Sequence, residues 1–466
     1  MKEELPNIVL VVLDTARWDH FGCYGYSRPT TPTVDSLARD GMQVETMIAN
    51  GPWTLPSHGS LFTGLYPTQH GSQWQTGPRM RDEVKKTLAE WLAEQGYHTV
   101  CVTNNGLISQ RTGLARGFKD YVFRLDLEQG RPRVARRVQK VLFGGDSGGR
   151  IVNAWLRDHL PEMPKPLFLF VNYLECHWSY VPPRRMERRV GGPRFGFVEG
   201  VRYRAGLARS AGAWEAIARA DERQLEIYRT LYDGELANGD EHVSELLDVL
   251  RNAGQLDHGR TLFMVTSDHG EHVGEHGLAD HHASVDDHLI RVPFVAWGPG
   301  LVRRQRPSSL YEFVDVFPSI ARFLGREAPL AELHPRRKDL FDPNGERRDN
   351  LAFAEWRAWS DKEAARLGRR NPSYDFSGLG IDLVCVRDER FKLVRSSLGR
   401  QELYDLSGQP LEGRDCAAEH PGVVARLAAA LDRTVEGWHT QGEEPAEMTD
   451  QERREIEERL SALGYI

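Results

Sequence analysis

Metal-binding side chains gather in residues 266–282, which read TSDHGEHVGEHGLADHH. Asp268 and His269 directly follow an apolar run, and four more histidines follow within thirteen residues. A carboxylate beside a neutral imidazole suits Zn²⁺ or Mn²⁺, and additional oxygen ligands suit Mg²⁺ or Ca²⁺. The spacing of Glu271 and the glycines differs from the His-Glu-x-x-His helix of zinc proteases. The segment therefore predicts a metal site of another kind.

Residues 51–64, GPWTLPSHGSLFTG, supply a candidate nucleophile, Thr54. The small, apolar residues after Thr54 predict the start of a helix. A hydroxyl at a helix N-terminus lies where backbone N–H groups favour an anion, which suits attack on phosphorus or sulfur. The commoner role of Thr54 or Ser57 is simply to cap the helix. His58 either bonds the backbone or contacts the substrate anion.

Apolar runs alternate with helical segments through the first two thirds of the chain. This alternation predicts a three-layer α/β/α sandwich with a mostly parallel central sheet, whose strands are buried on both faces. The predicted strands are residues 7–13, 97–103, 167–173 and 261–267, and the predicted helices are residues 33–39, 87–95, 151–159 and 222–253.

Polar residues follow these strands, and ligands bind at the carboxyl ends of strands in such sheets. We therefore expect Asp14, Asn105, His177, Asp268 and His269 to converge on one rim. An Asp at the position of Asp14 can be a metal ligand, a helix cap or a loop hydrogen-bond acceptor, and taken alone it is more often one of the latter two. His177 is either a satisfied buried histidine or a group that protonates the leaving group or contacts an oxyanion.

The pattern changes near residue 340. We expect a catalytic domain over residues 1–340 and a small C-terminal α+β subdomain over residues 341–466, with an antiparallel hairpin and an amphipathic helix at residues 423–438. Residues 182–210 are rich in arginine and form an insertion or lid. Such a lid could gather an anionic substrate, although a solvated loop is the more ordinary interpretation.

Composition excludes several classes of protein. The net charge is −7, from 60 basic and 67 acidic residues, so no overall basic field exists for nucleic acid, and we expect no nucleic-acid partner. The sequence contains no run of roughly 18 apolar residues, so we expect no membrane anchor. Five scattered cysteines predict free thiols and a cytoplasmic location. The oligomeric state is not predicted.

Taken together, these motifs resemble the sulfatase branch of the alkaline-phosphatase superfamily, over nearly the whole chain. Their joint order and spacing are highly specific. The matching segments are Asn-Ile-Val-Leu-Val-Val-Leu-Asp14, Gly22-Cys-Tyr-Gly25, Thr63-Gly-Leu-Tyr-Pro-Thr-Gln-His-Gly71, Thr266-Ser-Asp-His-Gly270, Arg291-Val-Pro293, Arg387-Asp-Glu-Arg-Phe-Lys-Leu393, Glu402-Leu-Tyr-Asp-Leu406 and Leu463-Gly-Tyr-Ile466.

The chain also departs from that family. Sulfatases carry a Cys or Ser that is oxidised to formylglycine, whereas this chain has Thr54-Leu-Pro-Ser-His58, similar to the Thr-x-Pro-x-His of nucleotide pyrophosphatases/phosphodiesterases. We therefore expect no formylglycine. Thr103-Asn-Asn-Gly106 replaces the usual Gly-Lys-x-His, and His281 or His282 replaces a later lysine. These histidines could hold a second ion, but one divalent metal is favoured.

The resemblance implies a hydrolase in which Asp14, Asp268, His269 and the Thr54 oxygen hold Mn²⁺, Zn²⁺, Ca²⁺ or Mg²⁺. The predicted substrate is a small anionic phosphate or phosphonate ester, a mono- or diester. The side chains expected to contact its oxygens or protonate the leaving group are His58, His177, Asn105 and one of His281 or His282. The alternatives are a sulfatase that uses unmodified Thr54 and a transferase to an alcohol or sugar.

Overall fold

The computed structural model describes most of the chain. Some residues named above lie outside the described part. They are the predicted motif at residues 463–466, Arg194 and most of residues 130–149. The described residues are 4–73, 79–127, 142, 144–193, 195–207, 214, 216–217, 219–301, 304–329, 338–342, 350–360, 365, 368–369, 376–408 and 411–438.

An eight-stranded sheet forms the centre of the molecule, with the strand order β10-β2-β9-β6-β1-β5-β3-β4. All neighbouring strands are parallel except β9, which runs antiparallel to both β2 and β6. The strands are β1 (Asn7–Leu13), β2 (Met42–Ile48), β3 (His98–Thr103), β4 (Asp120–Phe123), β5 (Leu167–Tyr173), β6 (Thr261–Thr266), β9 (Arg291–Trp297) and β10 (Arg304–Glu312).

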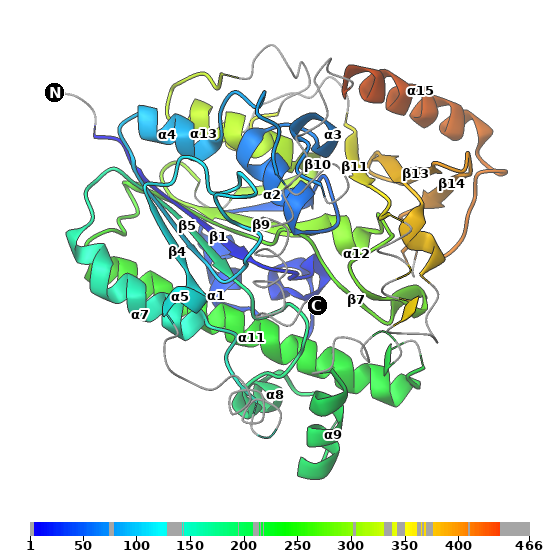
Figure 1. The fold of residues 1–466 in the computed structure, drawn as a ribbon, viewed down its shortest axis with the longest axis horizontal. Helices are drawn as coiled ribbons and strands as arrows, with labels where there is room; N and C mark the ends of the chain where they lie inside the picture. Colours follow the sequence, from blue (N-terminus) through cyan, green and yellow to red (C-terminus); the bar gives the residue numbers. More distant parts are fainter. Residues whose placement is uncertain are drawn as a thin grey trace.

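Helices cover both faces of this sheet, as the alternating pattern predicted (Figure 1). Both β1 and β5 are buried along their whole length, because every side chain on either face meets a helix layer. One face carries α1 (Pro32–Asp40), α7 (Gly149–His159) and α11 (Glu222–Asn252), and the other carries α2 (Thr54–Thr63), α4 (Leu88–Glu94) and α13 (Val316–Phe323). The three-layer fold class is confirmed.

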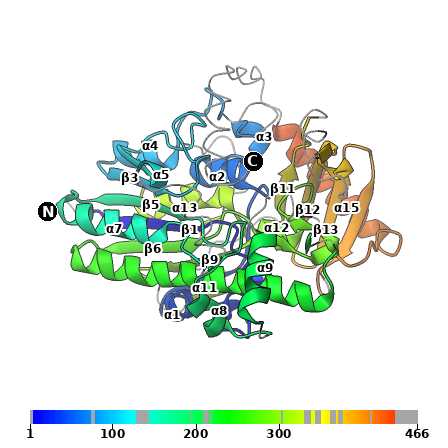
Figure 2. The ribbon, with the colours of Figure 1, turned by 60° about the horizontal axis from the view of Figure 1, so that its bottom comes forward.

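A second sheet, antiparallel and four-stranded, lies beside the large one (Figure 2). It confirms the small C-terminal sheet and the predicted hairpin. Its strands run in the order β11 (Ala352–Trp356), β12 (Leu383–Arg387), β13 (Phe391–Ser396) and β14 (Gln401–Asp405), and α15 (Pro421–Trp438) packs against β12 and β13.

Several short elements connect these layers. The helices among them are α3 (Pro67–His70), α5 (Arg124–Leu127), α8 (Arg184–Val190), α9 (Phe197–Leu207) and α12 (Asp287–Ile290), and the remaining strands are β7 (His272–Val273) and β8 (Ala279–Asp280). Single 3₁₀ turns span Trp18–His20, Gly22–Tyr24, Leu160–Glu162, Glu275–Gly277, Phe313–Asp315 and Ser377–Gly380. Within the described ranges, no helix combines the length and the apolar character that crossing a bilayer requires.

The arginine-rich insertion folds into α8 and α9, and several of its arginines face carboxylates. Arg185 pairs with Glu241 on α11, and the buried Arg204 pairs with Glu187. Arg189 Nη2 lies 3.9 Å from Asp240 Oδ2. Because three of the arginines contact carboxylates in this way, the contacts favour a packed surface insertion over a basic lid that gathers anions.

Candidate active site

The carboxyl ends of the central strands bring the predicted metal ligands together. Asp14 follows β1, and Asp268 and His269 follow the neighbouring parallel strand β6. One ligand atom from each of the three side chains lies within 4.8 Å of the other two. All three residues are fully buried. The expected convergence on one rim is therefore present in the fold.

These three side chains suit a divalent cation. The atoms Asp14 Oδ1, Asp268 Oδ2 and His269 Nε2 are buried and have no hydrogen-bond partner in the part of the chain that the structure describes. His269 Nδ1 donates to the Gly270 carbonyl at 2.9 Å, which leaves a lone pair on Nε2. Two buried carboxylate oxygens and an imidazole nitrogen that lack hydrogen bonds are costly unless a cation balances them.

The pKa shifts of two of these side chains also favour a cation at this position. Burial raises the pKa of Asp268 well above its usual range, and the neighbouring Asp14 raises it further. Burial lowers the pKa of His269 well below its usual range, and nearby His281 adds to that effect. A neutral imidazole is the form that binds a metal, so the donor set fits the expected group.

The turn after Asp14 is held in an unusual conformation. Thr15 has φ 58°, a left-handed value that is rare for a β-branched residue and costs about 1–3 kcal/mol. Its N–H donates to Asp268 Oδ1 at 3.1 Å, and its carbonyl accepts from the Tyr232 hydroxyl at 2.8 Å. The same hydroxyl accepts from the N–H of Arg17 at 2.8 Å. These contacts fix the two ligand loops to each other and to α11.

Thr54 is the first residue of α2, and Trp53 occupies the capping position without a side-chain cap bond. Thr54 is therefore not the N-cap. Its Oγ1 accepts from Asn105 Nδ2 at 3.1 Å, and the same amide donates to Asp14 Oδ2 at 2.9 Å. The Ser57 hydroxyl instead donates to the Asp268 carbonyl at 2.5 Å. Asn105 thus bridges the candidate nucleophile and a candidate metal ligand.

His58 and His177 occupy different surroundings. His58 Nδ1 donates to the Thr54 carbonyl at 3.0 Å, and its ring packs edge-on against Phe62 and Phe170. Burial lowers the pKa of His58 to about 4, so it is neutral. Of the two roles considered for His58, this geometry corresponds to the hydrogen bond with the backbone. His177 lies at the site, with its ring centroid 5.3 Å from that of His281.

The two candidate histidines that replace the lysine lie side by side. Their Nδ1 atoms are 2.8 and 3.2 Å from Asp280 Oδ1, and with Asp280 they form a second group that could hold an ion, but their rings face different surroundings. The ring centroid of His281 lies 4.4 Å from that of His269. His282 stacks behind His281 and meets Trp359 and Trp356, with centroids at 4.8 and 5.9 Å. His281 therefore borders the metal ligands, whereas His282 borders an aromatic cluster.

Three polar residues of the site were not among the sequence candidates. Glu271 and Asp280 both lie beside His281 Nδ1, at 3.0 and 2.8 Å. Asn172 Nδ2 donates to Asp14 Oδ2 at 3.1 Å. Glu271 and Asp280 stand inside the histidine-rich motif, so their acidic type was a usable signal. Asn172 was not recognisable, because only the β1–β5 register brings it beside Asp14.

Known proteins resemble this chain in sequence and in fold. A family model described as "Sulfatase" matches residues 6–326. An arylsulfatase of Clostridium perfringens is 22% identical over 456 residues, covering 87% of this chain and 89% of that protein. An uncharacterized sulfatase, YidJ, of Escherichia coli is 23% identical, covering 87% of this chain and 82% of its own length.

Solved structures extend the comparison. A phosphonate monoester hydrolase of Agrobacterium radiobacter has a TM-score of 0.69 at 21% identity, covering 96% of this chain and 98% of that one. A 2-O GAG sulfatase has a TM-score of 0.67 at 18% identity, covering 97% and 100%. With the fold, the family match defines an ester hydrolase of the alkaline-phosphatase superfamily. More specifically, the chain belongs to the sulfatase family.

Proposed function

We propose that the protein hydrolyses phosphate or phosphonate esters through a covalent intermediate on Thr54. The observation that carries this proposal is the position of Thr54 Oγ1: it stands at the start of α2 and shares the Asn105 amide with Asp14. The helix N-terminus favours the negative charge of a bound ester and of the intermediate. Because oxidation to formylglycine requires Cys or Ser, the proposal uses the unmodified Thr54 hydroxyl.

Each nearby side chain has a proposed role. Asp14, Asp268 and His269, with the Thr54 oxygen, would hold one divalent metal ion. When bound, this ion supplies Lewis acidity that activates the hydroxyl and offsets charge on the ester oxygens. Asn105 orients Thr54, His58 fixes the first turn of α2, and His177 and His281 contact the ester oxygens or the leaving group. His282 lies behind His281, against the aromatic cluster.

Phosphorus is favoured over sulfur for a chemical reason. A sulfate ester on an aldehyde hydrate leaves by elimination from the hemiacetal, whereas a Thr54 sulfate ester has no such route. Turnover of sulfate esters by an unmodified threonine is therefore expected to be slow. The similarity to the phosphonate monoester hydrolase supports this preference. The similarity to the arylsulfatase supports a second candidate, sulfate ester hydrolysis by unmodified Thr54.

The test compares the wild type with Thr54→Ala on aryl phosphate monoesters, phosphate diesters, phosphonate esters and sulfate esters, with added Mn²⁺, Zn²⁺, Ca²⁺ or Mg²⁺. We expect kcat/KM to be highest on a phosphorus ester and to fall at least about a thousandfold in Thr54→Ala. Thr63→Ala, at the buried far end of the same helix, is the matched control and should retain kcat. A sulfate ester as the best substrate would refute the preference, and product analysis with added alcohol tests for transfer.

Two broader assignments accompany this function. Residues 1–340 would form the catalytic domain and residues 341–466 a subdomain built on the second sheet. All five cysteines are free thiols, which supports a reducing compartment such as the cytoplasm.

A further inference from the structure

The loop that carries His281 and His282 has an unusual backbone. Three of its non-glycine residues have left-handed φ values: His276 at 53°, Asp280 at 71° and Ala283 at 56°. Asp280 and Ala283 directly flank the histidine pair. Such conformations are uncommon and cost about 1–3 kcal/mol each, so surrounding contacts must hold them in place.

Two carboxylates hold one nitrogen of His281. Its Nδ1 lies 3.0 Å from Glu271 Oε1 and 2.8 Å from Asp280 Oδ1. The second Asp280 oxygen accepts from Trp214 Nε1 at 2.9 Å. Glu271 is fully buried, and His281 is 5% exposed. Because ionised carboxylates only accept hydrogen bonds, Nδ1 is the donor, and Nε2 is the nitrogen that remains for other partners.

Glu271 also connects the two loops of the site. It stands two residues after His269 and just before β7, whereas His281 follows β8. These strands pair antiparallel, so Glu271 reaches His281 across a short hairpin. The contact locks the His281 ring at 4.4 Å from the ring of a metal ligand. His282 Nδ1 lies 3.2 Å from Asp280 Oδ1, on its own loop, and the His282 ring packs on tryptophans.

From this geometry we infer that Glu271 is a positioning residue: it fixes the His281 ring so that Nε2 is directed to the ester oxygens. The inference rests on the proposed function, because it assigns His281 to the same reaction. Glu271 itself does not touch the substrate. The strained loop sets the position of the histidine, and Glu271 sets the rotation of its ring.

The test uses Glu271→Leu, which removes the acceptor, and Glu271→Gln, which retains an oxygen for Nδ1–H. We expect kcat to fall about a hundredfold in Glu271→Leu and less than about tenfold in Glu271→Gln, with KM nearly unchanged in both. Bound metal, measured by elemental analysis, should stay at the wild-type level. Affinity for inorganic vanadate should fall in parallel with kcat.

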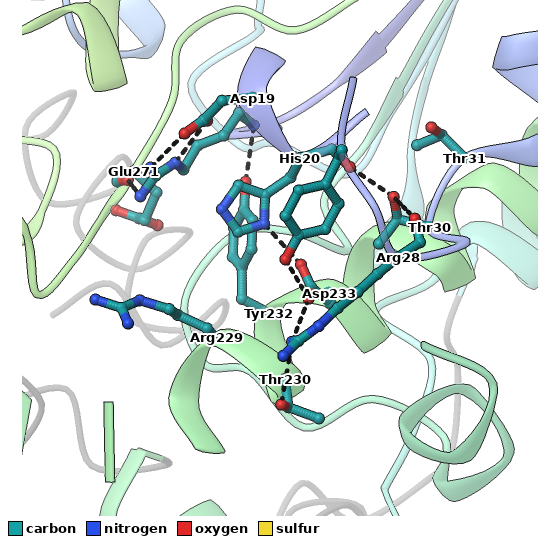
Figure 3. Close-up of polar contacts among 12 residues, drawn as sticks. Asp19, His20, Arg28, Thr30, Thr31, Arg229, Thr230, Tyr232, Asp233 and Glu271 are labelled. Atoms are coloured by element: carbon teal, nitrogen blue, oxygen red, sulfur yellow. Dashed lines mark hydrogen bonds and ion pairs between the residues drawn. The ribbon is translucent and has the colours of Figure 1, made fainter. Parts of the chain in front are cut away.

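Asp233→Asn is the matched control. Asp233, on α11, is likewise fully buried and accepts from a histidine, His20 of the Trp18–His20 turn, at 2.6 Å; Figure 3 shows this pair beside Arg28, which also contacts Asp233. It should lose stability and keep kcat per folded molecule. Wild-type kcat in Glu271→Leu, loss of its metal, or an equal fall in Asp233→Asn would overturn the inference. If the wild type hydrolyses no ester, the proposed function fails, and vanadate affinity still decides the role of Glu271.

Discussion

At the scale of single residues, the site trades stability for a cation-binding arrangement. Asp14 and Asp268 are both fully buried, and neither Asp14 Oδ1 nor Asp268 Oδ2 has a hydrogen-bond partner among the residues described. Burial and the adjacent Asp14 raise the pKa of Asp268, which means that its charged form is disfavoured in the metal-free protein. Functional sites commonly hold such locally unfavourable groups.

We therefore predict opposite effects of Asp268→Asn on stability and on metal binding. The asparagine keeps an oxygen for the N–H groups of Thr15 and His269, which donate to Asp268 Oδ1 at 3.1 and 3.0 Å, but it removes a buried charge. In EDTA the variant should melt at least about 2 °C above the wild type. Metal affinity measured by calorimetry should fall at least about tenfold. A lower melting temperature in EDTA would contradict the charge argument.

At the scale of elements, α11 organises one side of the site. Its Tyr232 holds the turn after Asp14, and its Asp240 accepts from the N–H groups of Thr33 and Val34 at the start of α1. Further along α11, His242 Nε2 lies 2.6 Å from Asp146 Oδ2 and 3.5 Å from Glu175 Oε1. One helix of 31 residues thus tethers α1, the Asp14 turn and the segment that leads into α7.

The His242 contacts predict a pH dependence of stability. Burial alone lowers the pKa of His242, but its hydrogen bond to Asp146 and the nearby carboxylates of Glu245 and Glu175 outweigh burial and raise this pKa to about 10. The stabilisation is therefore complete below about pH 6.5 and is lost as pH rises towards 10.

Between about pH 6.5 and pH 10, we expect the free energy of unfolding of the wild type to fall by roughly a few kcal/mol. We expect His242→Gln to abolish most of this dependence of stability on pH. Denaturant unfolding at several pH values measures it. His159→Gln, an exposed histidine at the end of α7, is the control and should leave the slope unchanged. Parallel pH profiles for wild type and His242→Gln would exclude this role.

At the scale of the whole molecule, buried charges join the two sheets. Asp287 begins α12, five residues after His282, and its carboxylate pairs with Arg387 on β12 and with Lys392 on β13. Lys392 Nζ lies 3.1 Å from Asp287 Oδ1 and also bonds Glu412 and the Val285 carbonyl. Lys392 is fully buried. The second sheet therefore anchors the loop that supplies His281.

Removal of one charge from this cluster should be costly. Lys392→Met leaves Glu412 without its cation and Asp287 with one partner fewer, so we expect a loss of about 3–5 kcal/mol in the free energy of unfolding. Arg414→Met breaks the exposed Arg414–Glu419 pair on the same sheet unit and should leave the free energy of unfolding nearly unchanged, because solvent screens this pair. Chemical denaturation compares them. A cost for Lys392→Met no larger than that of the control would rule out a structural role for the cluster.

The sequence predicted the large features because they follow from local patterns. Continuous apolar runs specify strands buried on both faces, and residues 167–173 and 222–253 were predicted close to their observed bounds. The strands β2, β9 and β10 were not predicted as strands. In β2, MQVETMI mixes polar and apolar residues, and the side chains of Glu45 and Thr46 are exposed or partly exposed. Burial on one face only gives a weaker signal.

By itself, the sequence determined that Asp14, Asp268 and His269 would meet, because the carboxyl ends of parallel strands share one edge of the sheet. Only the tertiary structure decided which histidine borders them, what Asn105 bridges, and which carboxylates hold His281. Those features depend on strand register and on left-handed residues such as Asp280. Contacts between residues far apart in the chain determine the strand register and the left-handed conformations. Local residue patterns do not encode such contacts.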